Sequence, residues 1–256
     1  MIMKRLAAVI TVRRGIAVQS FGYARHLPMG DPAVIAHTLD RWGADEIFLN
    51  CIDRQQHGPD FALLDRIGKL GLATPLIYAG GIRSQADGVQ VVKLGADRVA
   101  VDAMLRDSPQ EIHALSESLG AQGIIAALPV SLRGGRLLWR DYRRRTDEPL
   151  GETLLETLTA GRISEALLID WQNEGTSGSF DTGIIDAFPV STMPIIAFGG
   201  AGEPALMQRL LSHPAVAAVA VGNSLSWREH AVQALKAGLS GLPVRRASFA
   251  GSEVRA

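Results

Sequence analysis

Residues 43–82 contain GADEIFLNCIDRQQHGPDF and TPLIYAGGI, and residues 163–201 contain ISEALLIDWQNEGTSGSF and MPIIAFGGA. The two stretches match in order and type, and equivalent residues such as Glu46 and Glu165 lie 119 positions apart. Solenoid repeats recur every ~20–50 residues, so this period is too long for a solenoid. It indicates one domain built from two similar halves.

Each copy begins with a short apolar run, and eight such runs occur along the chain. They are short and apolar nearly throughout, which is typical of parallel strands that are buried on both faces of a sheet. They lie at residues 6–12, 46–52, 75–79, 98–102, 123–130, 165–170, 194–198 and 216–221.

Amphipathic stretches that fit helices follow these runs, at 31–42, 61–70, 84–94, 108–119, 150–160, 183–188 and 204–211. Alternating strands and helices in a chain of this length favour a (β/α)8 TIM barrel over an open doubly wound sheet. The fold class is therefore α/β, with a twofold half-barrel repeat. We expect one barrel over 1–242, with halves of about 1–120 and 121–242, and a polar tail over 243–256.

The composition excludes several kinds of partner. The chain has 256 residues, with 26 Lys and Arg against 26 Asp and Glu, so its formal charge is zero and neither nucleic acid nor an anionic membrane is an expected partner. The single cysteine, Cys51, cannot form an intramolecular disulfide, which favours the reducing cytoplasm. No apolar run approaches the ~18 residues of a membrane span. We expect a soluble cytoplasmic protein.

Glycine-rich turns recur at equivalent strand ends in both halves. Backbone N–H groups in such turns favour phosphate, although a tight turn can require glycine without any ligand. Duplication in four symmetric places favours phosphate, and we expect a phosphorylated small-molecule ligand, although the carboxylate of Asp102 would repel it. The candidate residues are Gly80, Gly81, Asp102, Ala103, Gly199, Gly200, Ala201, Gly202, Gly222 and Asn223.

Longer motifs carry a resemblance that covers about residues 4–235. They are KRLAAVITVRRGIAVQS, GDPAVIAHTLDRWGADEIFLN, YAGGI, GADRVAVDAML, NEGTSGSFDTGII and PIIAFGGAG. With them the chain resembles the HisF family, the cyclase subunit of imidazole glycerol phosphate synthase in histidine biosynthesis. The resemblance implies a barrel with two phosphate sites. It also implies a HisH-like glutaminase partner, bound as a heterodimer on the opposite face, that sends ammonia through the barrel core.

The chain departs from this family where the cyclase carries its two catalytic aspartates. Thr11 and Pro129 stand at those positions, and Gln19 replaces an expected lysine. Proton transfer on both sides of a substrate needs titratable groups, so the usual acid–base pair is absent. Glu174 and Asp53 are the weak candidates that are left, and Glu174 also fits a role in ordering its loop.

Four charged residues match the positions of the family's ring at the base of the barrel. They are Arg5, Glu46, Arg98 and Glu165, with Arg98 in place of the usual lysine. The resemblance implies a gate through which ammonia passes. The alternative is a structural ion-pair plug, because the N-terminal face of a barrel normally serves stability. We favour the gate, since the ring persists where the aspartates do not.

Three functions are left open. The chain is a cyclase of histidine biosynthesis with lyase activity, a paralogue that conducts ammonia from a glutaminase to another acceptor, or a non-catalytic phosphate-binding scaffold. We favour the second. The chain resembles the branch of the family that supports acetamidino modification of lipopolysaccharide-type glycans. Ile52-Asp53 and Gly222-Asn223 carry this resemblance, although Pro129 departs from that branch too. Whether the barrel is itself an enzyme stays open.

The remaining candidates are less specific. The six histidines show no metal-ligand spacing, so we expect no metal and no cofactor. Cys51 lacks an evident histidine partner and fits a buried core thiol. The basic run from Arg133 to Arg145 is either a functional loop or a solvated hairpin.

Overall fold

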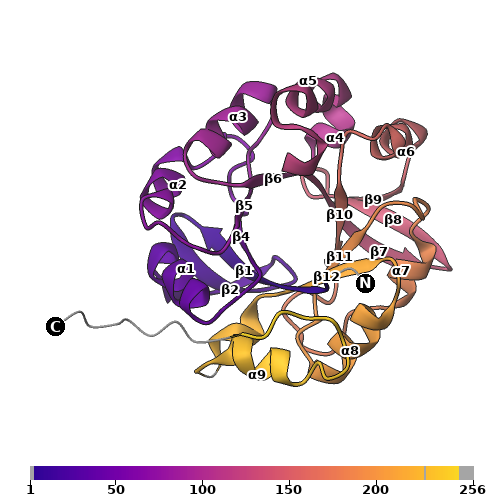
Figure 1. Cartoon of the computed structure of the whole chain (residues 1–256). Helices are drawn as coiled ribbons and strands as arrows, with labels where there is room; N and C mark the ends of the chain where they lie inside the picture. Colours follow the sequence, from indigo (N-terminus) through magenta and orange to yellow (C-terminus); the bar gives the residue numbers. More distant parts are fainter. Residues whose placement is uncertain (1–2, 228, 248–256) are drawn as a thin grey trace.

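The computed structural model describes residues 3–227 and 229–247. Eight parallel strands form a closed barrel, because each pairs with the next and the last pairs with the first (Figure 1). The strands are β1 (Arg5–Arg13), β4 (Glu46–Cys51), β5 (Leu76–Ala79), β6 (Arg98–Val101), β7 (Ile124–Arg133), β10 (Glu165–Asp170), β11 (Ile195–Phe198) and β12 (Val216–Val221). The predicted (β/α)8 TIM barrel is confirmed, and its strands coincide with the eight apolar runs.

Helices surround the barrel as an outer ring (Figure 1). They are α1 (Pro32–Arg41), α2 (Phe61–Gly68), α3 (Gln85–Lys93), α4 (Met104–Asp107), α5 (Pro109–Leu119), α6 (Glu152–Thr159), α7 (Gly183–Ala187), α8 (Pro204–Ser212) and α9 (Ala231–Ala237), with the 3-10 turns η1 (Ala121–Gly123) and η2 (Asn223–Ser226). Seven of the α-helices coincide with the amphipathic stretches that the sequence predicted. The short α4 and α9 were not predicted from the sequence.

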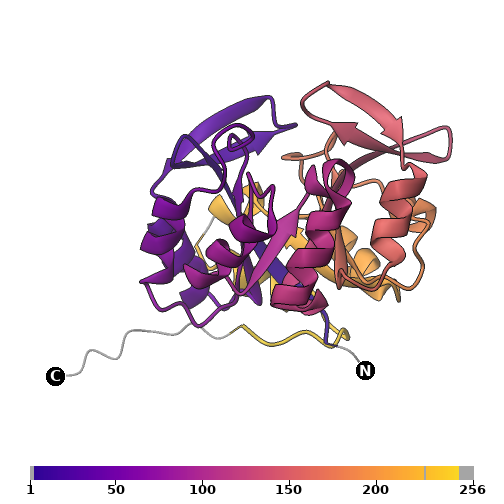
Figure 2. The same cartoon turned by 90° about the horizontal axis from the view of Figure 1, so that it is seen from above.

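Two antiparallel hairpins extend from one end of the barrel (Figure 2). The first joins β2 (Ile16–Phe21) and β3 (Arg25–Gly30), and the second joins β8 (Arg136–Asp141) and β9 (Thr146–Pro149). Each follows the first strand of its half. The sequence did not predict β2 and β3 as strands, because β3 is exposed along almost its whole length and shows no apolar alternation.

Side chains fill the interior of the barrel. Along each strand alternate residues point inward, and Phe48, Ile77 and Ile125 are among fourteen buried apolar residues that pack together there. Tyr23 packs against this cluster. The interior is thus a packed core, as in other barrels of this class.

The first glycine of each Gly-Gly pair is required by strand packing. Gly80 and Gly199 have φ of +127° and +101°, and a Cβ on them would lie 2.2 Å from the carbonyl oxygen of Cys51 and 2.3 Å from that of Asp170. Cys51 and Asp170 are themselves equivalent residues of the repeat. The fold therefore accounts for these two glycines without a ligand.

The chain beyond α9 returns to the start of β1. The backbone N–H of Lys4 donates to the carbonyl oxygen of Pro243 at 2.8 Å, and Arg245 pairs with Asp45 at 2.9 Å. Residues 248–256 of the expected polar tail lie outside the described residues, and the expected domain limits stay a prediction. Within the described part of the chain, no helix has both the length and the apolar character needed to cross a membrane.

We expect Gly199→Ala to destabilise the protein more than Gly161→Ala. Gly161 also has a positive φ, +72°, but a Cβ added to it would meet nothing within 4 Å. Both substitutions incur the left-handed backbone penalty of about 1–2 kcal/mol. Only Gly199→Ala also forces backbone atoms apart, so its total loss in the free energy of unfolding should be at least ~3 kcal/mol. Urea unfolding measures both. Equal losses would contradict the packing argument.

Candidate functional site

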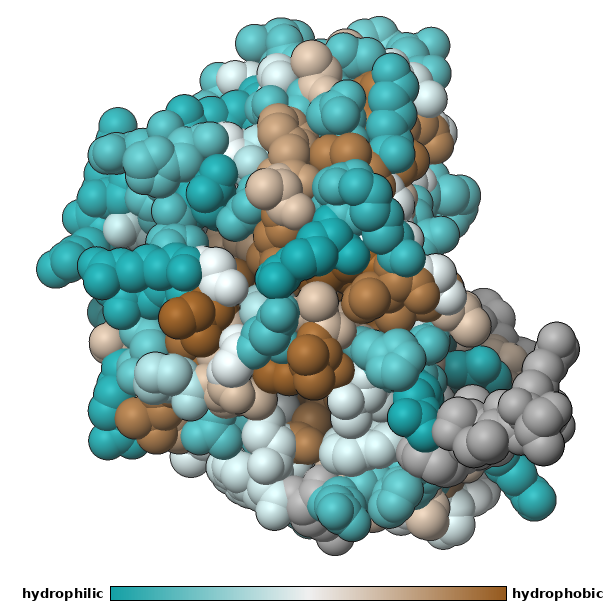
Figure 3. Space-filling view, turned by 90° about the vertical axis from the view of Figure 1, so that its left-hand side faces the viewer, coloured by the Kyte–Doolittle hydropathy of each residue, from teal (hydrophilic) through white to brown (hydrophobic). Residues whose placement is uncertain are grey.

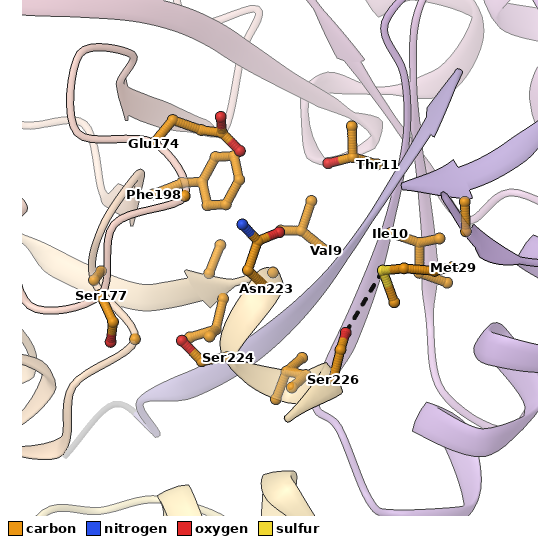
Figure 4. A pocket seen from close by; sticks show the side chains of 18 of the residues that line it. Val9, Ile10, Thr11, Met29, Glu174, Ser177, Phe198, Asn223, Ser224 and Ser226 are labelled. Carbon is orange, nitrogen blue, oxygen red and sulfur yellow. Dashed lines mark hydrogen bonds between the residues drawn. The ribbon is translucent and has the colours of Figure 1, made fainter. Parts of the chain in front are cut away.

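A cavity of about 250 Å³ opens at the mouth of the barrel, on the hairpin side (Figure 4). It lies between β1 and the segments that follow β10, β11 and β12, and Thr11, Glu174 and Phe198 are part of its wall. The candidate phosphate residues of the second half that line it are Gly200, Ala201, Gly202, Gly222 and Asn223. Gly199 does not line it, nor do the candidates of the first half, Gly80, Gly81, Asp102 and Ala103.

This wall offers an anion the hydroxyls of Thr176, Ser177 and Ser224 and a set of backbone N–H groups. The Glu203 carboxylate already accepts the N–H groups of Ala205 and Leu206 at the start of α8, at 3.0 and 2.9 Å. By contrast, the N–H groups of Ala201 and Gly202 donate to no other residue in the described part of the chain. A ligand at this turn would therefore meet two backbone donors ahead of the helix.

The Asn223 side chain is already engaged in holding the first hairpin. Its amide nitrogen donates to the Ser20 carbonyl at 2.7 Å, and its oxygen accepts the Ser20 N–H at 3.2 Å. Asn223 can therefore contribute only its backbone to a ligand without breaking this tie.

The equivalent turn of the first half is arranged differently. Asp102 lies at this turn with its side chain exposed to solvent. Desolvation raises its pKa, and the nearby Ala103 N–H and Arg143 oppose this shift. The protein's own carboxylate thus lies beside a backbone donor that a phosphate would use. Phosphate binding at the four elements stays a prediction.

No titratable group replaces the two aspartates of the cyclase at their own positions. Thr11 and Pro129 fall on the inward-facing side of β1 and β7, by alternation with Val9 and Ala127. Thr11 lines the cavity, whereas Pro129 does not. Acid–base chemistry in this mouth would have to use other residues.

Glu174 connects its loop to the first hairpin. Its carboxylate accepts the Ser20 hydroxyl at 3.0 Å and the Tyr23 N–H at 3.1 Å, and its carbonyl accepts the Gly22 N–H at 2.9 Å. The side chain is buried, and burial raises its pKa despite these donors. This geometry orders the loop. Asp53 likewise bonds the first hairpin, because its carboxylate accepts the Arg14 N–H in the β1–β2 turn at 2.7 Å. Catalysis by either carboxylate stays a prediction.

Sequence reasoning missed a further buried carboxylate, Asp170, at the end of β10. It accepts the Asp181 N–H at 2.9 Å and the Asn173 side-chain amide at 2.7 Å, which shapes the loop beside the cavity. Burial raises its pKa. Its repeat equivalent is Cys51, so neither the repeat nor spacing indicated a loop-organising acid here.

A pair of tyrosines, also missed, joins the two hairpins across the mouth. The rings of Tyr23 and Tyr142 meet edge to face, with centroids 5.5 Å apart and planes at 71°. Burial raises the pKa of both phenols. The two residues lie 119 positions apart, so the repeat period applied to the hairpin turns would have singled them out.

The basic run is paired with acids in the second hairpin. Asp141 is buried and lies within salt-bridge distance of Arg106, Arg143 and Arg144, at 2.7, 3.6 and 3.9 Å. Desolvation alone would raise its pKa, but the Arg106 hydrogen bond and backbone donors outweigh this and bring it to about 2. The Arg106 guanidinium also lies 4.6 Å above the Trp139 ring. These contacts hold the hairpin against α4.

The four charged residues at the base of the barrel form a closed ring, here called the charge ring. Each is the first residue of its strand, β1, β4, β6 or β10. Arg5 bonds Glu165 and lies 3.2 Å from Glu46, while Arg98 lies 2.6 Å from Glu165 and 3.4 Å from Glu46. Every cation therefore contacts both carboxylates.

Burial sets the electrostatics of the charge ring. It raises the pKa of Glu46, and the two arginines oppose that shift. Burial alone would lower the pKa of Arg5, but the two carboxylates raise it overall. The two arginines thus offset part of the cost of burying the carboxylates of Glu46 and Glu165.

The remaining candidates do not form a reactive centre. Cys51 is buried, and burial raises its pKa to about 12, so the thiol is neutral near pH 7. Among residues 3–227 and 229–247, no group of three or more His, Cys, Asp or Glu side chains is placed to hold a metal ion.

These features define a two-half (β/α)8 barrel with a pocket at its mouth and a charge ring at its base. Residues 5–230 match the sequence profile of the family described as "Histidine biosynthesis protein". The chain belongs to this family, in which it is a divergent HisF-like protein.

The relatives carry the name imidazole glycerol phosphate synthase subunit HisF. The protein from Solibacter usitatus is 31% identical over 256 residues, covering 96% of this chain and 99% of its own length. That from Thermococcus gammatolerans is 28% identical, with the same coverage, and that from Helicobacter hepaticus is 29% identical, covering 94% and 98%.

We expect Glu174→Gln to change how stability depends on pH. The raised pKa means that the folded state holds this proton more tightly than the unfolded chain. The carboxyl's contribution is therefore fully present below the unfolded pKa of about 4.3 and is lost as the pH rises through the folded pKa. The free energy of unfolding of the wild type, relative to the variant, should fall from pH 4 upward in urea titrations.

Glu203→Gln is the matched control. Backbone N–H donors lower the pKa of Glu203, so its contribution is present above the unfolded pKa and is lost as the pH falls. The two variants should show opposite trends. A common trend would contradict the assignment for Glu174.

Proposed function

We propose that this barrel is the ammonia-receiving subunit of a glutamine amidotransferase. A HisH-like glutaminase docks on the face where the strands begin, and ammonia passes the charge ring to reach a phosphorylated small molecule at the mouth. The observation that supports this is a contrast within one barrel. The charge ring is complete and fully paired, whereas Thr11 and Pro129 supply no acid or base at the other end.

The apolar interior of the barrel suits passage of a neutral molecule. Moving a charge through an apolar interior is costly, and neutral ammonia avoids that cost. The side chain of Arg5 is 30% exposed, so the charge ring can be reached from the docking face. Above the ring the interior is packed with apolar side chains, and passage therefore requires them to move.

The competing role for the charge ring is a structural plug. Removing one partner of a buried ion pair costs about 3–5 kcal/mol, and stability alone is then a sufficient reason to keep the four charges. The two roles differ in whether a partner binds over the ring.

The acceptor that we propose is a surface-glycan sugar that receives an acetamidino group in the cytoplasm. Support comes from the resemblance at Ile52-Asp53 after β4 and at Gly222-Asn223 after β12. The second of these turns lines the cavity at the mouth, where the phosphorylated ligand would lie.

A second candidate is the cyclase of histidine biosynthesis. Its support is the likeness to proteins named HisF over nearly the whole chain. The residues at positions 11 and 129 oppose it, because loss of one acid–base group typically costs about 10²–10⁴-fold in rate.

We expect the chain not to complement a strain that lacks its own cyclase. The positive control is a HisF relative that keeps both aspartates, expressed from the same plasmid. The double variant Thr11→Asp with Pro129→Asp should recover traces of activity, because it restores the two carboxylates. Normal growth with the wild-type chain would overturn the proposed sugar acceptor in favour of the cyclase.

We expect a HisH-type glutaminase to protect the base of the barrel. In hydrogen–deuterium exchange of the co-purified complex, protection should fall on the amides near Arg5, Glu46, Arg98 and Glu165, and not on the two hairpins. Arg5→Ala should still bind the glutaminase, with Arg66→Ala as the control because Arg66 pairs with Asp31 on the outer surface at 3.0 Å. If no glutaminase binds and Arg5→Ala only unfolds the protein, the charge ring is a plug.

A further inference from the structure

The cavity at the mouth continues through the barrel wall. β1 pairs with β12 only from Arg5 to Ala8. Beyond Ala8 the chain after β12 turns away at Gly222, and the gap is lined by Val9 and Ile10 on one side and by Val221 and Gly222 on the other. We call this gap the seam. It leads from the glycine turn to the outer face of the barrel beside α1.

The outer part of the cavity, here called the α1 wing, differs in chemistry from the glycine turn. Its walls are Ile10, Ala17, Val18, Met29, Ile35, Thr38, Leu39, Trp42, Leu225 and Ser226. The Thr38 hydroxyl already donates to the Val34 carbonyl at 2.9 Å, and the Ser226 hydroxyl to the Met29 sulfur at 3.6 Å (Figure 4). The wing therefore offers an apolar wall with both of its hydroxyl donors engaged.

We propose that the pocket binds a phosphate monoester whose apolar group lies in the α1 wing. This inference rests on the phosphate site of the proposed function and not on its sugar acceptor, which an apolar phosphate monoester would replace. The phosphate meets the N–H groups of Ala201 and Gly202, and the apolar group crosses the seam. A cavity of about 250 Å³ is far larger than the ~30 Å³ share of one water molecule. It therefore accommodates several carbon atoms beside the phosphate.

The outer end of the α1 wing opens onto an apolar surface. Met29 is 38% exposed and Val34 64% exposed, and Trp227, next in sequence to the wing residue Ser226, is 58% exposed. Figure 3 shows apolar residues gathered across the middle of the face that carries α1 and α2. A ligand with a longer apolar chain can continue onto this surface after it passes the contact between Ser226 and Met29.

The first half of the barrel argues for one phosphate rather than two. Its glycine turn does not line the cavity, and the exposed carboxylate of Asp102 lies beside the Ala103 N–H there. A second phosphate would meet this negative charge. The apolar wing and the single anion site together favour an amphiphilic monoester over a compound with a phosphate at each end.

Calorimetric titration of the full chain with methyl, butyl and hexyl phosphate tests the inference. Each methylene that enters the wing should increase the affinity about fourfold, the factor for burying one CH2 group. Thr38→Asp places a carboxylate in the wing and should abolish this dependence while methyl phosphate still binds. The matched control is Thr159→Asp in α6, where the hydroxyl bonds the Leu155 carbonyl at 2.9 Å in the same way but lies outside the cavity.

Met29→Asp at the exposed rim gives a second variant in case Thr38→Asp does not fold. Equal affinities for the three esters would overturn the α1 wing alone and leave the phosphate site in place. Failure of all three esters to bind would overturn both the wing and the phosphate site. If the affinity rises with chain length but neither wing variant changes it, the apolar group lies elsewhere and the inference is wrong.

Discussion

The rest of this structure depends on a parallel pairing of four residues between the first and last strands. Arg5 to Ala8 of β1 pair with Ala218 to Val221 of β12, which closes the barrel. Below this pairing the strand starts are held close enough for the charge ring to form. Above it the two strands separate, and the cavity at the mouth is lined by residues on both sides of that separation. Closure at one end thus allows an opening at the other.

Sequence reasoning reached the barrel because its signal is local and repeated: eight apolar runs and a period of 119 residues. The charge ring was identified through the resemblance to the HisF family, and it agrees with the strand starts, which share one face of a barrel. The Tyr23–Tyr142 contact and the seam were not predicted, because each depends on how segments distant in sequence approach one another. The hairpin β2–β3 is local, but β3 is exposed and carries no strand pattern. The glycine pairs show the same limit. Their pattern suggests phosphate, yet the carbonyl oxygens of Cys51 and Asp170 already require Gly80 and Gly199.

The two halves share a backbone arrangement but differ in the side chains at their equivalent strand ends. In the second half the turn after β12 borders a cavity, and the Asn223 side chain ties that turn to the first hairpin. In the first half Asp102 occupies the equivalent strand end and places a carboxylate beside the Ala103 N–H. A single acidic side chain thus makes a nearly symmetric mouth chemically one-sided, which gives a bound molecule a defined orientation.

The charge ring also bears on how such a barrel can arise from a half. Both arginines, Arg5 and Arg98, come from the first half. By strand register their equivalents in the second half are Gly123 and Ala218, while Glu46 and Glu165 are equivalent to each other. A barrel assembled from two copies of the first half would crowd four arginines around two glutamates, and one made from two second halves would bury two glutamates with no cation. In neither of these barrels would the charges of the ring balance. The present halves have become mutually dependent, so any ancestral half that formed a barrel with its own copy must have carried different residues at these positions.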